Sequence, residues 1–168
     1  MNKKLINLKL LTDEFDEKLN LEGFDNRLLL QKRVYLIQRL GVNFGFNFHW
    51  YLKGPYCPEL TECAFTLKAD TETQEAANSF VFNDDATAIL DRYKGLEREV
   101  SSLYGRRLPD WLELMASIHF MRKYAYVPGF PRISRDNIGQ ALCRKGKVFP
   151  QKMVEKAWDL VDSRLFKE

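Results

Sequence analysis

The chain has 168 residues, of which 45% are hydrophobic, 13% aromatic and 29% charged, and its formal net charge at pH 7 is +3. These values are typical of one globular domain that folds by itself and is large enough to bury a core. A transmembrane helix requires a run of about 18 apolar residues, and the sequence contains no such run, so a membrane-spanning protein is not expected.

The N-terminus and the cysteines indicate the cellular compartment. Residues 1–19 carry two early lysines, but polar residues interrupt the apolar part and no small-residue cleavage site follows, so a signal peptide is not expected. Cys57, Cys63 and Cys143 fit neither metal-ligand spacing nor a disulfide framework. We therefore expect a reduced, cytoplasmic protein that does not bind a membrane.

Two helices are predicted in the first forty residues. Apolar residues recur every three or four positions from Leu5 to Leu21, which predicts an amphipathic helix that Gly23 ends. Asp25 is a candidate cap for a second helix over residues 26–40, with Gly41 at its C-terminal end. Because apolar residues cover much of its circumference, this second helix should be the central helix of the core.

Residues 44–53 alternate strictly between two kinds of side chain. Since successive side chains of a strand point to opposite faces, the segment is predicted to be a strand with one buried aromatic face. The apolar parity comprises Phe44, Phe46, Phe48, Trp50 and Leu52, and the mixed parity comprises Gly45, Asn47, His49, Tyr51 and Lys53. A sharp turn at Lys53-Gly54-Pro55 follows, and Pro58 is well placed as the first residue of a helix.

The remaining elements follow from apolar spacing and from proline, glycine and capping residues. In chain order we expect a helix over 58–68, a polar loop over 70–80, a short strand at 80–82, a long helix from Asp84 that Gly105 closes, a helix from Pro109 that ends before Pro128, a short helix from the cap Ser134 to Gly146, and a final helix from Pro150.

The predicted fold class is therefore mainly α (α+β), with a single helical domain and one short aromatic strand or β-hairpin. This domain covers residues 1–168. Within it we expect an N-terminal helix over 1–22, a core over 25–126 and a basic C-terminal helical pair over 132–168.

Residues 29–60 resemble the core of the YwgA-like family. The shared features are a helix of the type QKxVYLLQ (QKRVYLIQ in this chain), an aromatic strand and a GPYSPEL-like turn (GPYCPEL here). The segment LELMASIHFM at 112–121 also fits the general pattern of that family. A more distant similarity is to the SocA-like antitoxin domain, also called Panacea. The resemblance implies a helical fold and a role as a protein-binding regulatory domain. Cys57 stands where a serine is common, so a side-chain cap of the next helix would be weakened.

The turn and the adjacent strand form the candidate partner-binding site. The turn presents a cation and an aromatic side chain beside a rigid backbone, which suits recognition, although glycine and proline also serve turn geometry alone. The candidate partner-binding residues are His49, Tyr51, Lys53, Gly54, Pro55 and Tyr56. His49 has no carboxylate partner nearby in the sequence, so a hydrogen-bonded structural histidine is the alternative to a general base.

A second candidate site is the basic segment 132–152. Between Val127 and Lys152 there are six cations and one acid, a local charge of 6 − 1 = +5, which leaves 3 − 5 = −2 for the remainder of the chain. Such asymmetry suits contact with phosphates or an acidic protein. The candidate nucleic-acid-binding residues are Arg132, Arg135, Arg144, Lys145 and Lys147.

Three functions are compatible with these patterns. The favoured hypothesis is a protein-interaction or regulatory module, antitoxin-like or associated with a defence system. The alternative is a winged-helix-like nucleic-acid-binding protein. An enzyme would have to use scattered residues such as His49, Tyr51, Glu59 and Glu62. Because the sequence contains no phosphate loop, nucleophile elbow or metal motif, we assign no catalytic residue, metal or cofactor.

Overall fold

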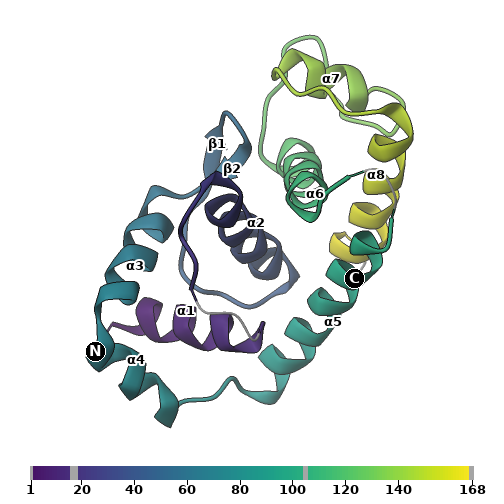
Figure 1. Cartoon of the computed structure of the whole chain (residues 1–168). Coiled ribbons are helices and arrows are strands. Elements are labelled where there is room, and N and C mark those ends of the chain that lie inside the picture. Colours follow the sequence, from purple (N-terminus) through teal and green to yellow (C-terminus); the bar gives the residue numbers. More distant parts are fainter. Residues whose placement is uncertain (1, 16–18, 104–105, 167–168) are drawn as a thin grey trace.

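A computed structural model of the protein describes residues 2–15, 19–103 and 106–166. In this part the chain forms eight α-helices, one 3-10 turn and a two-stranded antiparallel hairpin (Figure 1). The elements are α1 (Lys3–Glu14), α2 (Phe24–Leu40), β1 (His49–Tyr51), β2 (Gly54–Tyr56), α3 (Pro58–Ala69), α4 (Thr71–Ala76), η1 (Ala77–Ser79), α5 (Asp84–Ser101), α6 (Leu108–Lys123), α7 (Ile138–Arg144) and α8 (Gln151–Leu165). The prediction of a mainly helical fold with a short β element is confirmed.

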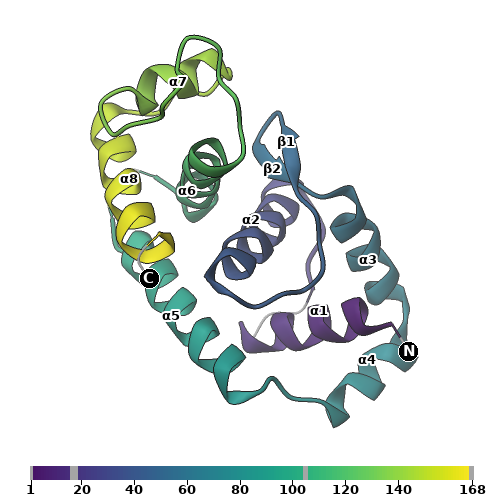
Figure 2. The ribbon, with the colours of Figure 1, turned by 180° about the vertical axis from the view of Figure 1, so that it is seen from behind.

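Helix α2 is the central helix, as its sequence indicated. Four consecutive residues, Val34 to Ile37, are each 0% exposed, which requires neighbours on every side of the helix. These neighbours are α3, α5, α6 and β2, and both ribbon views show the other elements arranged around α2 (Figures 1 and 2). Helix α6 packs against α2 and also against α8, and α8 in turn contacts α7.

The connection between α1 and α2 differs from the prediction. Helix α1 ends at Glu14 rather than Leu21, and α2 begins at Phe24 after Gly23 instead of being capped by Asp25. The ring of Phe15 packs edge to face on Tyr93 with centroids 6.0 Å apart, so the end of α1 is fixed by a tertiary contact. Leu21, expected on the helix, is buried in the connection. Residues 16–18 of the expected helix lie outside the described residues.

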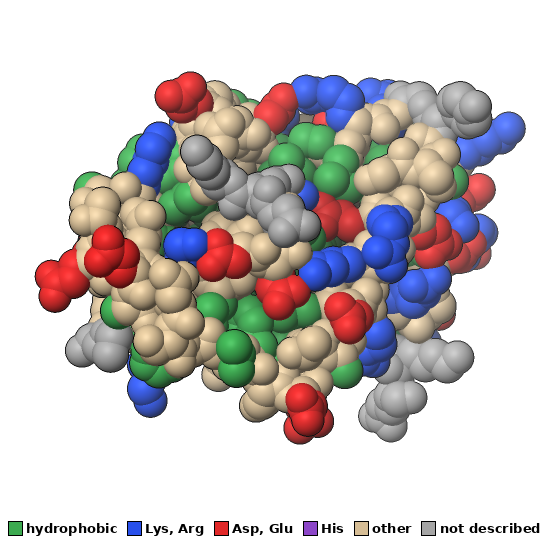
Figure 3. Space-filling view, turned by 60° about the horizontal axis from the view of Figure 1, so that its bottom comes forward, with side chains coloured by type: hydrophobic (Ala, Val, Ile, Leu, Met, Phe, Trp, Pro, Cys, Tyr) green, Lys and Arg blue, Asp and Glu red, His purple; other side chains and the backbone are tan. Residues whose placement is uncertain are grey.

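The predicted loop at 70–80 is wrong, because it contains α4 and η1. The carboxylate of Asp70 accepts hydrogen bonds from both the backbone N–H and the hydroxyl of Thr73, and this starts the helix. The expected strand at 80–82 has no pairing partner among the described residues, and Phe80 and Val81 are exposed. Figure 3 shows hydrophobic side chains at the surface between charged ones on this side of the molecule. Helix α5 is described to Ser101, and its expected end at Gly105 lies outside the described residues.

The aromatic segment has the predicted alternation of burial but little of the predicted strand. Phe44, Phe46 and Phe48 are buried, whereas the residues between them are exposed. Only His49–Tyr51 pairs with another strand, and the register places Trp50 opposite Pro55. The prediction for Leu52 is wrong: its side chain is 93% exposed, because it lies in the turn of the hairpin where the alternation of the strand ends.

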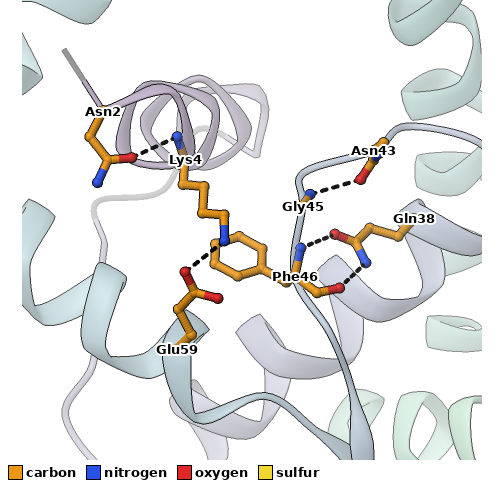
Figure 4. Close-up of polar contacts among 7 residues, drawn as sticks. All are labelled: Asn2, Lys4, Gln38, Asn43, Gly45, Phe46 and Glu59. Carbon is orange, nitrogen blue, oxygen red and sulfur yellow. Dashed lines mark hydrogen bonds and ion pairs between the residues drawn. The ribbon is translucent and has the colours of Figure 1, made fainter.

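Polar side chains of α2 bind the backbone of this extended segment where a neighbouring strand is missing. The amide of Gln38 accepts from Phe46 N–H at 3.1 Å and donates to Phe46 C=O at 2.9 Å (Figure 4). Gln31 binds Cys57 in the same two-bonded way, at 2.9 and 2.8 Å. The two glutamines are 38 − 31 = 7 positions apart, about two helical turns, and therefore lie on one face of α2.

Gly54 is required by both its backbone and its surroundings. Its φ of +84° lies in the left-handed region that favours glycine. A Cβ atom at this position would lie 2.4 Å from the buried hydroxyl of Ser117 on α6. The hairpin therefore lies against α6 with no room for a side chain at this point.

The aromatic face should contribute strongly to stability. We expect Phe46→Ala to lower the free energy of unfolding by about 3–5 kcal/mol, because it deletes a buried ring and leaves a cavity. Leu52→Ala is the matched control on the same segment and should change it by less than about 0.5 kcal/mol, since its side chain is in solvent. Urea unfolding of both variants measures the difference, and equal effects would show that the aromatic face is not part of the core.

Candidate functional site

A pocket of about 350 Å³ lies between the N-terminal half of α2 and the β-hairpin. We call it the hairpin pocket. Its lining residues are Phe24, Arg27, Leu28, Gln31 and Lys32 from α2, and Tyr51, Leu52, Lys53 and Tyr56 from the hairpin. Residues about 30 positions apart thus form one concave surface, because β2 packs against α2 and β1 pairs with β2.

The structure brings together three of the six predicted partner-binding residues. Tyr51, Lys53 and Tyr56 line the hairpin pocket. Gly54 and Pro55 are buried behind it, where they fix the turn. His49 is exposed but does not line the pocket.

The rim of the hairpin pocket exposes large apolar side chains. Phe24 is 54% exposed, Tyr51 46% and Leu52 93%. The Tyr51 ring packs edge to face on Tyr56 with centroids 5.2 Å apart, and the Tyr56 hydroxyl hydrogen-bonds with Thr61 on α3 at 2.9 Å. One wall is therefore fixed by α3, while the turn projects an apolar side chain into solvent.

Lys32 lies beneath the pocket with no exposed surface, and its amine donates to Pro55 C=O at 2.5 Å. Burial lowers the pKa of Lys32 to about 7; Glu113 opposes this shift and Lys147 adds to it. Among the described residues no carboxylate lies within ion-pair distance of this amine. A neutral carbonyl is thus its hydrogen-bond acceptor.

Lys147 lies at the other end of the turn, which corrects its predicted role. Its amine donates to Leu52 C=O at 2.9 Å and to the carboxylate of Glu113 on α6 at 2.7 Å. The side chains of Lys147 and Glu113 are 3% and 7% exposed, so Lys147 is not free to contact a phosphate. Burial lowers the pKa of Lys147, and the bond to Glu113 opposes this shift. Two buried lysines therefore bind the carbonyl of Leu52 in the turn and that of Pro55 on β2.

The other predicted nucleic-acid-binding residues differ in their availability. Arg135 forms two hydrogen bonds with Asp159 on α8, at 2.9 and 3.2 Å. Lys145 is half-buried with its amine 5.8 Å from the centre of the Trp50 ring. Arg132 and Arg144 are exposed, and neither forms an ion pair with a described residue.

The second histidine of the chain, His119, and the candidate acid Glu59 are each bound to a structural partner. His119 is buried, with Nδ1 2.7 Å from the Tyr35 hydroxyl, and burial together with the charge of Arg39 lowers its pKa to about 3. Glu59 forms an ion pair with Lys4 at 2.6 Å (Figure 4). In the described ranges no three His, Cys, Asp or Glu side chains are grouped so that they could hold a metal ion.

A second groove, of about 540 Å³, separates α1 from the segment before α5. Ile6 and Leu10 form one side, and Phe80 and Phe82 form the other. The one charged residue that lines this groove is Asp85, and no cation is among the described lining residues. The hairpin pocket, by contrast, is lined by three cations and no acid.

Comparison of the chain with family models, curated proteins and solved structures gives no match. The resemblance of residues 29–60 to the YwgA-like family stays a prediction. None of the described helices combines the length and apolar character needed to cross a bilayer.

The sequence patterns did not predict that residues of α2 line the hairpin pocket. Gln31 and Lys32 are 1% and 0% exposed, although they are polar residues in a helix whose core face is apolar. The three consecutive polar residues 31–33 between Leu28 and Tyr35 are the signal that the sequence offers, since buried polar groups need specific partners. The partners, Cys57 and Pro55, are more than 20 positions away, so the pattern alone did not identify them.

Burial of Lys32 should make stability rise with pH. Between pH 7 and 10.5 the unfolded chain holds a proton on Lys32 that the folded chain has lost, so the free energy of unfolding increases as pH rises. We expect a gain of about 2 kcal/mol between pH 7 and pH 9 from this residue. Lys32→Met should remove it, whereas Lys152→Met at an exposed site is the control. Urea unfolding at pH 7, 8 and 9 measures the slopes, and equal slopes for wild type and Lys32→Met would contradict the assignment.

Proposed function

We propose that the protein is a protein-interaction module that binds a partner protein through the hairpin pocket and the exposed side chains around it. The observation that carries the proposal is the exposure of Phe24, Tyr51 and Leu52 around one concave site. Exposed apolar patches rimmed by polar residues mark interaction sites, and aromatic side chains are enriched among binding hot spots.

The anchoring of the hairpin supports this proposal. Lys32 and Lys147 hold the carbonyls of Pro55 and Leu52, and Gly54 lies against Ser117. A turn fixed at these points loses little conformational freedom on binding, and this reduces the entropic cost of association. The exposed Leu52 side chain is thus presented on a preorganised backbone.

The charges of the pocket indicate the chemistry of the partner. Arg27, Lys32 and Lys53 line it without an acidic residue. A partner that places a carboxylate beside an apolar group complements this surface. The resemblance to the YwgA-like and SocA-like families supports a regulatory role of the antitoxin or defence-associated kind.

The nucleic-acid alternative depends on fewer residues than the sequence indicated. Lys147 is buried in an ion pair and Arg135 is bonded to Asp159, which leaves Arg132, Arg144 and the half-buried Lys145. Contacts between three cations and the phosphates of a nucleic acid would contribute only modestly to affinity. We therefore favour the protein partner.

A photocrosslinking experiment tests the proposed function. We place p-benzoylphenylalanine at Leu52 and, as the control, at Val81, which is 88% exposed in the second groove. In an extract of the native cells, the probe at position 52 should crosslink one protein that the probe at 81 does not reach. Phe24→Ser combined with Leu52→Ser should reduce capture at least about tenfold, because the removed side chains are exposed and the fold does not need them.

Two outcomes would contradict the proposal. One is the same crosslinked proteins, or none, from both positions. The other is a salt-sensitive gel shift with duplex DNA that Arg132→Glu/Arg144→Glu abolishes and the Phe24→Ser/Leu52→Ser variant retains, which would favour the nucleic-acid alternative.

A further inference from the structure

The hairpin pocket and the second groove differ in charge: the hairpin pocket combines apolar walls with a buried amine that has no ion-pair partner among the described residues, whereas the second groove is lined by Asp85 and no cation. Lys32 is 0% exposed, and its acceptor is the neutral Pro55 carbonyl. The nearest acidic influence on it is Glu113, which is already bonded to Lys147. The site therefore has an unmet preference for a negative charge.

The size of the pocket limits what can enter. At about 350 Å³ it is near the lower end of the range of about 300–1,000 Å³ for ligand sites. One large side chain fits this volume, whereas a helix or a strand would have to lie outside it. The occupant must then bring an apolar group and an anion in a single residue.

A carboxyl-terminal apolar residue meets both conditions. Its side chain supplies the apolar contact, and its main-chain carboxylate supplies the charge a few ångströms away. An internal Asp or Glu would supply the charge but leave the apolar walls uncovered. Capture of a chain end through its carboxylate is a known mode of peptide recognition.

We propose that the hairpin pocket binds the carboxyl-terminal residue of the partner protein, with its apolar side chain between Phe24, Tyr51 and Leu52 and its carboxylate held by Arg27 and Lys53 above the buried Lys32. This inference rests on the proposed function and names the part of the partner that is recognised. Because Lys32 has no exposed surface, its charge acts on the carboxylate from beneath the pocket, and Arg27 and Lys53 make the direct contacts.

The arrangement links binding to protonation of Lys32. A bound carboxylate favours the charged amine and raises its pKa, so binding takes up a proton. The other charged or titratable groups that face Lys32 or the pocket are Arg27 on α2, Tyr51, Lys53 and Tyr56 on the hairpin, Glu113 on α6, and Lys147. With a pKa of about 7 in the free protein, affinity should fall by about three- to tenfold between pH 6 and pH 8.

Two matched probes test this inference on the full chain. N-acetylphenylalanine carries the ring and the carboxylate of a chain end, and N-acetylphenylalaninamide carries the same ring without the charge. Calorimetric titration at millimolar concentrations should show the acid binding at least about tenfold more tightly than the amide. Its affinity should decrease from pH 6 to pH 8, and heats in buffers of different ionisation enthalpy should report proton uptake at pH 7.

Two variants locate the effect. Lys53→Met, at an exposed site, should weaken binding of the acid and leave the pH dependence in place. Lys32→Met should abolish the pH dependence, and circular dichroism checks its fold; the wild-type pH profile tests the proposal even if this variant unfolds. Equal binding of acid and amide, no binding of either, or an affinity unchanged between pH 6 and pH 8 would each overturn the proposal.

The partner itself separates this inference from the proposed function. If a protein crosslinks at position 52 and still binds equally well after its last residue is removed, the chain-end proposal fails and the protein-interaction function stands. If no protein crosslinks at position 52, the proposed function fails as well.

Discussion

The polar side chains of α2 that bind backbone atoms of residues 46–57 hold the structure around the candidate site in place. Gln38 satisfies both backbone groups of Phe46, Lys32 satisfies the carbonyl of Pro55, and Gln31 satisfies both groups of Cys57. An extended segment without a strand beside it would otherwise bury unpaired backbone groups, which is costly. These bonds let the aromatic side chains enter the core while the hairpin turn stays at the surface.

The hairpin is positioned by buried charge as well as by apolar packing. Burying an amine is unfavourable unless it has partners, and the partners here are Leu52 C=O and Glu113 for Lys147, and Pro55 C=O for Lys32. A hydrogen bond requires a defined direction, whereas aromatic packing does not. These lysines therefore restrict the position of the turn more closely than aromatic contacts could. The amine of Lys32 lies beneath the hairpin pocket and is the basis of the proposed recognition of an anion there. One buried residue thus connects the architecture of the turn with its proposed recognition chemistry.

Several features could be read from the sequence because they depend on neighbouring residues. The central position of α2 followed from its apolar circumference, and the buried face of Phe44, Phe46 and Phe48 followed from strict alternation. Cys57 makes no side-chain cap, in line with the expected weakening of the cap, but its backbone is held by Gln31, a distant partner that the local pattern does not reveal. Another expectation failed where a distant group decides. Lys147 belongs to a basic segment in the sequence, yet its amine is buried because it binds Glu113 and the carbonyl of Leu52 in the turn.

By itself, the sequence determined the helical class, most helix starts and the aromatic face, since propensity, capping residues and periodicity act over a few positions. Only the tertiary structure decided that Phe24, Arg27 and Lys32 meet Tyr51 and Lys53 in one pocket. It also decided which cations are buried and which remain at the surface. The physical reason is that burial and pairing depend on groups brought together from far along the chain, and a lysine has the same local pattern whether its amine ends in water or on a buried carbonyl.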